Sequence, residues 1–123
     1  MPNSPEAERP WPEELRLSPD KTALTVAFDT GARFALPAEY LRVESPSAEV
    51  QGHAASQKQT IGGKHAVKIK DIERVGNYAV RILFDDGHDS GLFSWDYLHE
   101  LGRDHDRKWA DYLKALRAKR LER

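Results

Sequence analysis

Two similar stretches decide the fold: ALTVAFDTG at residues 23–31 and AVRILFDDG at residues 79–87. Each stretch alternates apolar and polar residues up to a phenylalanine, as a half-buried strand does, and then enters a turn that ends in glycine. The two stretches lie 56 residues apart, and a Tyr-Leu pair recurs at 40–41 and 97–98. The chain therefore contains a weak internal repeat.

Each copy of the repeat predicts three strands followed by a short helix. Pro37 is placed to open the first helix, and Ser94 and Gly102 are placed to begin and end the second. The strands are expected at 15–17, 24–28 and 33–36 in the first copy, and at 66–75, 78–84 and 88–93 in the second. We therefore expect an α+β fold: a mainly antiparallel β module of two strand-strand-strand-short helix units, with a C-terminal amphipathic helix. The shared core is expected to include Phe28, Tyr40, Phe84 and Tyr97.

Three regions are expected along the chain: a flexible lead-in at 1–13, one domain at 14–102 and a basic helix at 103–123. The lead-in contains four of the seven prolines. The last region has eight basic and four acidic residues, whereas the rest of the chain is net negative. Asp104 is placed to cap its helix, which is expected to continue to residue 122. The apolar face of this helix is expected to consist of Trp109, Tyr112, Leu113 and Leu116.

The composition excludes several classes of protein and site. The chain has 123 residues, 39% of them hydrophobic, and a formal net charge of -1. It has no cysteine, which excludes disulfides, thiolate zinc sites, cysteine-held iron–sulfur clusters and thiol nucleophiles. No apolar stretch approaches the roughly 18 residues of a membrane-spanning helix, and the first residues are unlike a signal peptide. We therefore expect a cytoplasmic protein without a membrane partner.

No local motif for catalysis is present. The sequence Gly62-Gly63-Lys64 lacks the first glycine and the Ser or Thr of a phosphate-binding loop. The nucleophile elbow, the zinc-protease motif and the His-x-Asp pair of a facial triad are also missing. We therefore expect that the chain is not an enzyme.

The long stretch between the two copies is the first place to look for function. Residues 44–64 are rich in Ser, Gln and Gly, and structureless loops beyond about 12 to 15 residues are uncommon unless they are functional or disordered. His53 follows Glu49 by four residues, which puts both on one side of a helix. His88 follows the Asp86-Gly87 turn and could face this loop. A single iron or zinc ion held by His88, His53 and Glu49 is the metal hypothesis.

Three segments carry a resemblance to a known family: LRVESPSAEVQGH at 41–53, VGNYAV at 75–80 and DGHDSGLFSWDYL at 86–98. They are similar to the gamma-butyrobetaine hydroxylase-like N-terminal domain, over about residues 15–101. The resemblance implies a compact, mainly β domain with short helices. In that family the domain stands before the catalytic domain of carnitine-pathway dioxygenases, or is attached to P-loop ATPases that carry iron–sulfur clusters, or occurs alone in bacteria.

The resemblance also implies the position of a metal cage that this chain lacks. In the dioxygenases the domain resembles a zinc-binding module with three cysteines after a Leu-Arg pair and a histidine in an Asp-Gly-His motif. Carried onto this chain, the cysteine positions fall on Ser45, Ser47 and Val50, and the histidine falls on His88. Serine and valine do not form a tetrahedral zinc site, so we expect the zinc cage to be absent.

The leading functional hypothesis is a non-catalytic adaptor that binds a protein partner. Its surface is expected to be the loop from Ser45 to Lys64 and the neighbouring Trp95, and no resident cofactor is expected. The resemblance implies an iron–sulfur carrier ATPase or an oxygenase as partner, and a link to iron–sulfur or redox cofactor metabolism. The expected partner-binding residues are Ser45, Ser47, Gln51 and Trp95.

Two alternatives remain open at this stage. One is the metal-binding protein described above, and the other is nucleic-acid binding through the basic C-terminal helix. The net negative body and the placement of the aromatic residues on the apolar helix face argue against nucleic acid.

Overall fold

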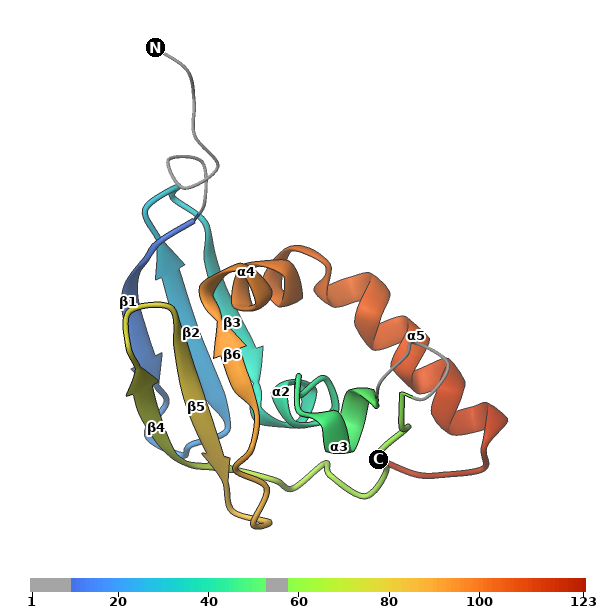
Figure 1. The fold of residues 1–123 in the computed structure, drawn as a ribbon. Helices are drawn as coiled ribbons and strands as arrows, with labels where there is room; N and C mark the ends of the chain where they lie inside the picture. Colours follow the sequence, from blue (N-terminus) through green and yellow to red (C-terminus); the bar gives the residue numbers. More distant parts are fainter. Residues whose placement is uncertain (1–9, 53–57) are drawn as a thin grey trace.

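Two three-stranded antiparallel sheets form the β part of the molecule. The computed structural model describes residues 10–52 and 58–123. The first sheet consists of β1 (Pro12–Leu17), β2 (Ala23–Phe28) and β3 (Arg33–Pro37), with β2 in the middle. The second consists of β4 (Ile69–Val75), β5 (Ala79–Phe84) and β6 (Leu92–Ser94), with β5 in the middle. Figure 1 shows the sheets as two layers, with the helices gathered along one side.

A helix follows each sheet, so the predicted α+β arrangement of two similar units is confirmed. In the first unit α2 (Ala38–Val43) follows β3, and in the second α4 (Trp95–Arg103) follows β6. Ser94 caps α4 as expected, because its hydroxyl accepts the backbone N–H of Tyr97 at 3.1 Å. The two remaining helices are α3 (Ala48–Gln51), which lies in the central stretch, and the C-terminal α5 (His105–Ala118).

The internal repeat extends to the hydrogen bonds of its turns. In each copy the phenylalanine that ends the middle strand donates its N–H to a carbonyl four residues later, at 2.8 Å from Phe28 and 2.9 Å from Phe84. The glycines of these turns, Gly31 and Gly87, have φ of 91° and 92°. This left-handed conformation costs glycine little, which explains why both turns end in glycine.

The core lies between the sheets and is shared by both copies, as predicted. The inward side chains of β2 and β5 belong to one buried cluster, and Tyr97 packs against it from α4. Tyr40 is completely buried, and its hydroxyl donates to the carbonyl of Leu101 at 2.7 Å. The tyrosine of α2 therefore joins the two helices that follow the sheets. The strand residues of the cluster are Leu24, Val26, Phe28, Leu36, Ile69, Val80, Ile82, Phe84 and Phe93.

Three element boundaries differ from the sequence expectation. Strand β1 begins at Pro12, so it includes the end of the expected lead-in, and residues 1–9 lie outside the described part. Strand β4 begins at Ile69 rather than at residue 66. Strand β6 has only three residues, because the chain turns toward the central stretch between His88, whose carbonyl still accepts the Phe84 N–H, and Leu92.

The C-terminal helix ends earlier than expected, and the Asp104 side chain does not cap it. Helix α5 ends at Ala118, and the chain then folds back so that the Arg123 guanidinium pairs with the Glu39 carboxylate at 2.7 Å. Asp104 occupies the N-cap position, but its carboxylate pairs with Arg103 at 2.9 Å instead of capping a backbone N–H. None of the helices in the described ranges is both long enough and apolar enough to cross a membrane.

Gly102 does not end α4, which corrects the sequence expectation. The helix continues through it to Arg103. A Cβ atom at position 102 would overlap the ring of Phe34, so the glycine permits close packing of α4 against β3. Glycine is therefore required at position 102 by a tertiary contact and not by a helix terminus.

Gly102→Ala is expected to destabilise the protein. Alanine is favoured over glycine inside a helix by about 1 kcal/mol, but the overlap with Phe34 should cost about 1–3 kcal/mol, so the clash decides the sign. Urea unfolding monitored by circular dichroism measures the difference. In a Phe34→Ala background the overlap is absent, and Gly102→Ala should then be neutral or stabilising. A stabilised Gly102→Ala single variant would contradict this account of the packing.

Candidate functional site

The central stretch is held against the body by its own polar groups. The Gln51 side-chain amide donates to the Ser45 carbonyl at 2.9 Å, and the N–H of Gln59 donates to the Val50 carbonyl at 2.6 Å. The ammonium of Lys58 lies 2.7 Å from the carboxylate of Glu44, whose side chain is only 3% exposed. The described parts of 44–64 therefore have a defined conformation, which includes the short helix α3.

His88 is the centre of a buried polar cluster. Its Nε2 atom lies 2.9 Å from the Ser45 hydroxyl and 3.3 Å from the Ser47 hydroxyl. Its Nδ1 atom lies 3.3 Å from the carboxylate of Glu49, which also accepts the Ser90 hydroxyl at 3.2 Å. His88, Ser45 and Ser47 are all buried, whereas Glu49 is exposed. The connection between β5 and β6 is thereby joined to the segment that leads into α3.

This cluster occupies the positions at which the family resemblance places a metal cage. Zinc bonds of about 2.3 Å to sulfur and 2.0 Å to nitrogen put tetrahedral ligands about 3.6 Å apart. The Ser45 oxygen is 2.9 Å from the His88 nitrogen, so the two groups bond to each other directly. Val50 is buried and offers no donor atom. Within residues 10–52 and 58–123, no three His, Cys, Asp or Glu side chains are grouped to hold a metal ion.

The contacts from Ser45 to His88 and from His88 to Glu49 resemble the serine–histidine–carboxylate contacts of a serine-hydrolase triad, but the serine is inaccessible. In such a triad the nucleophile must reach a substrate carbonyl beside a set of oxyanion donors. Ser45 is 0% exposed, and Gly91 lies so close to its hydroxyl that even a Cβ atom there would overlap it. The geometry therefore suits a structural hydrogen bond and not nucleophilic attack.

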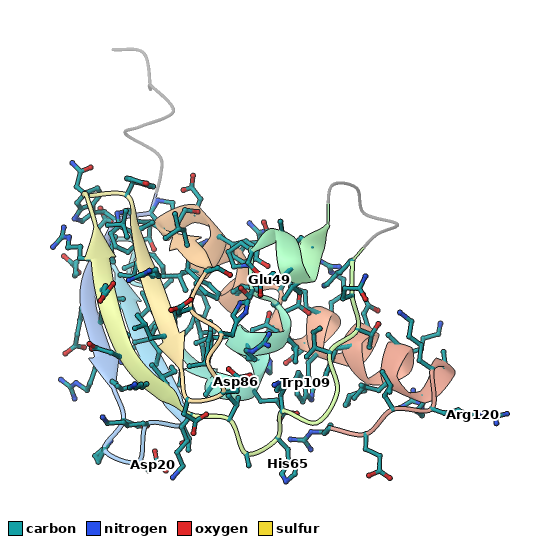
Figure 2. The ribbon with its side chains drawn as sticks, turned by 60° about the horizontal axis from the view of Figure 1, so that its bottom comes forward. Asp20, Glu49, His65, Asp86, Trp109 and Arg120 are labelled. Carbon is teal, nitrogen blue, oxygen red and sulfur yellow. The ribbon has the colours of Figure 1, made fainter. Side chains whose placement is uncertain are left out.

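A second charged network fixes the same turn. The Asp86 carboxylate contacts Arg42 Nε at 2.8 Å and Lys64 Nζ at 2.6 Å, and it accepts the backbone N–H of His88 at 3.0 Å. Burial acts to raise the pKa of Asp86, but the hydrogen bonds from Lys64, His88 and Arg42 outweigh it and lower the pKa to about 2. Figure 2 shows Asp86 and Glu49 between the sheets and α5.

The chemistry of His88 is set by its surroundings. Burial and the positive charge of Arg42 lower the pKa of His88, and the carboxylates of Glu49 and Asp86 only partly oppose this. The imidazole is therefore neutral near pH 7, so it can both donate and accept a hydrogen bond.

The structure brings some of the predicted site residues together and separates others. Ser45, Ser47 and Glu49 meet at His88, and Gln51 holds the backbone beside them. Trp95 lies at the opposite end of β5, where its indole N–H donates to the Asn77 carbonyl at 2.8 Å and its ring meets Trp11 edge-on. His53 lies outside the described residues. Because Ser45, Ser47 and Trp95 are buried, their side chains serve internal contacts in this structure.

Sequence reasoning missed the roles of Arg42, Asp86 and Lys58. Arg42 belongs to the Leu-Arg pair and Asp86 to the Asp-Gly-His motif, and the two residues form an ion pair with each other. Their presence in the two motifs was the available signal. Lys58 gave no signal, because its partner Glu44 is 14 residues away in an irregular segment.

The basic C-terminal helix is partly neutralised by neighbouring acids. Lys108 pairs with Glu100 at 3.1 Å, and Arg107 contacts Asp104 at 3.4 Å. Arg103 and Arg123 also have carboxylate partners. At least half of the eight basic residues of this region therefore have acidic partners among the residues that the structure describes.

His88→Ala is expected to destabilise the protein by about 2–4 kcal/mol at pH 8, because it removes the imidazole partner of two buried hydroxyls and creates a cavity. The folded-state pKa of His88 lies below its unfolded value, so its neutral form stabilises the fold at high pH and that stability is lost as the pH falls below about 6.5. The difference between wild type and variant should therefore shrink between pH 8 and pH 5. Urea unfolding across this range measures it.

Ser90→Ala is the matched control, since Ser90 is exposed and bonds only to the outer carboxylate in this cluster. Its effect should stay within about 0.5 kcal/mol at every pH. A His88→Ala effect equally small, or one that grows toward pH 5, would contradict the structural role assigned to the imidazole.

Comparison with known proteins gives a family and a set of solved structures. The family model described as "Gamma-butyrobetaine hydroxylase-like, N-terminal" matches residues 15–99. No curated protein matches the chain. One NMR solution structure is 44% identical with a TM-score of 0.81, and covers 94% of this chain and 90% of that one. A second is 42% identical with the same TM-score, and covers 99% and 91%.

A crystal structure widens the comparison. It is of a protein of unknown function from Acidithiobacillus ferrooxidans that belongs to the DUF971 family. It is 35% identical with a TM-score of 0.62, and covers 74% of this chain and 91% of that one. Since the family model covers well over half of the sequence, the chain belongs to the gamma-butyrobetaine hydroxylase-like N-terminal domain family.

Proposed function

We propose that this chain is a non-catalytic adaptor that binds a protein partner through the central stretch, residues 44–64. The observation that carries the proposal is the attachment of the described parts of this stretch, in which Gln51, Gln59 and Lys58 all bond to residues 44–50. A segment fixed in one conformation loses little conformational entropy on binding. Its outward residues, such as Ala48 and Glu49, remain exposed.

The proposal favours binding over catalysis because, among the described residues, the triad-like arrangement of Ser45, His88 and Glu49 is closed to a substrate. Ser45 is buried beneath Gly91, and the neutral imidazole of His88 is occupied by two serines and a glutamate. These groups stabilise the fold and leave no reactive atom for a substrate.

The proposed partner is an iron–sulfur carrier ATPase or an oxygenase, in the cytoplasm. This part of the proposal rests on the family, whose members stand beside such proteins within longer chains. A domain fused to a catalytic neighbour in some proteins can bind a separate neighbour when it occurs alone. The function would then belong to iron–sulfur or redox cofactor metabolism.

Binding to these two partners can be tested with purified proteins from the source organism. Isothermal titration calorimetry should detect one of them with the wild-type chain. Ala48→Arg places a long charged side chain on the exposed face of α3 and should weaken that binding at least tenfold, or about 1.4 kcal/mol. Thr30→Arg makes the same change of charge in the exposed β2–β3 turn and should have no effect. Binding that both variants weaken equally, or that neither partner shows, would refute the proposal.

Metal binding is the second candidate function, because Glu49 and His88 Nδ1 already meet at 3.3 Å. His53 would have to supply a third ligand, and neutral imidazole with carboxylate suits iron or zinc. Elemental analysis of untagged protein after incubation with each metal should show one equivalent, reduced by His88→Ala and by Glu49→Gln. Retention unchanged in both variants, or no retained metal in wild type, would exclude this site.

A further inference from the structure

A pocket of about 290 Å³ lies between the end of α2, residues 58–60 and α5. Glu44 and Val43 come from the first of these segments, and Tyr112 and Asp111 come from the helix. The Tyr112 hydroxyl donates to the Ile61 carbonyl at 2.5 Å. This hydrogen bond joins α5, which lines one side of the pocket, to the central stretch, which lines the other. This volume is at the lower end of ligand pockets and suits one long side chain rather than a large ligand.

The floor of this pocket carries a buried negative charge. The Glu44 side chain is 3% exposed, and its backbone carbonyl is fixed by the Tyr97 hydroxyl at 2.5 Å. A buried carboxylate needs a cation, because an unpaired charge inside a protein is strongly unfavourable. Lys58 supplies that cation at 2.7 Å, although its own side chain is 41% exposed.

The other cations at the pocket have acidic partners of their own. Lys108 pairs with Glu100 at 3.1 Å, and Arg107 lies 3.4 Å from Asp104 and 3.8 Å from Asp111. Lys58 is therefore the cation on which Glu44 depends. A cation brought by another molecule could replace it without leaving the buried carboxylate unpaired at the end of the exchange.

We propose that the Glu44 pocket receives a lysine or arginine side chain of the partner protein, in exchange for the chain's own Lys58. This inference rests on the proposed adaptor function and names the chemistry of the partner at the same stretch. Lys58 occupies the pocket in the free protein and moves into solvent when the partner's basic side chain pairs with Glu44. The exposed position of Lys58 makes this exchange possible without rearrangement of the core.

The test uses the 123-residue chain and Nα-acetyl-lysine N-methylamide as the probe, and binding is followed by amide chemical shifts in NMR. With wild type, shifts should be confined to residues around the pocket, such as Thr60, Tyr112 and Ala115. Glu44→Gln removes the charge but keeps the shape of the side chain, and it should abolish these shifts. Lys58→Met removes the competing cation and should tighten binding of the probe at least tenfold.

Two controls keep the outcome clear. Lys70→Met changes the net charge by the same amount at an exposed position of β4 and should behave as wild type. Nα-acetyl-glutamate N-methylamide should not bind. If Lys58→Met fails to fold, the comparison of wild type with Glu44→Gln still decides. Equal shifts in those two proteins, binding of the glutamate probe in preference to lysine, or no shifts at all would overturn the proposal.

The partner experiment separates this inference from the proposed function. If Glu44→Gln leaves the affinity for the protein partner unchanged while Ala48→Arg weakens it, the pocket proposal fails and the adaptor function stands. If the lysine probe binds but neither protein partner does, the adaptor function fails and the pocket remains.

Discussion

The arrangement of the central stretch depends on the need of the buried His88 imidazole for hydrogen-bond partners. A polar ring at 6% exposure must be satisfied by other protein atoms, and Ser45 and Ser47 supply them. The chain between His88 and Leu92 turns toward these serines instead of continuing along β5, and β6 has only three residues. The same turn brings Asp86 to Arg42 and Lys64, so both ends of the central stretch are tied to one connection.

Most of the fold could be predicted from the sequence because both copies of the repeat carry the same local signals for strands, turns and helix starts. The alternation of apolar and polar residues before Phe28 and Phe84 is a signal that can be read within a few residues. The glycines that end both turns are local signals as well. Ser94 is likewise a local cap. The predictions were wrong where a contact between residues far apart in the sequence determines the local structure. Gly102 lies inside α4 because Phe34 of another strand needs the space, and no neighbouring residue records that requirement.

The candidate site was only partly predictable for the same reason. The approach of His88 to Ser45 and Ser47 was available only through the family resemblance, since the residues are more than 40 positions apart. The spacing of Glu49 from His53 indicated only one side of a helix, and the structure shows that Glu49 contacts His88. Trp95 was expected to neighbour the central stretch, but it lies at the opposite end of β5 from His88. Sequence spacing shows which residues share one face of a helix or strand. It does not show at which end of a sheet those residues lie.

Hydrogen bonds and ion pairs hold the described parts of the central stretch, and each is much weaker than a structural metal centre. A structural zinc ion contributes about 10–16 kcal/mol at a single point, whereas one hydrogen bond contributes about 0.5–1.5 kcal/mol. The two serine contacts of His88 cannot supply the difference, so the attachment is distributed over other pairs. Arg42 with Asp86, Lys58 with Glu44, and Gln51 with the Ser45 carbonyl are such pairs. A stretch held by several weak contacts can exchange one of them, such as the exposed Lys58, while the others keep its shape. A stretch held by a single strong metal centre could not open locally in this way, because loss of the centre would release all of it at once.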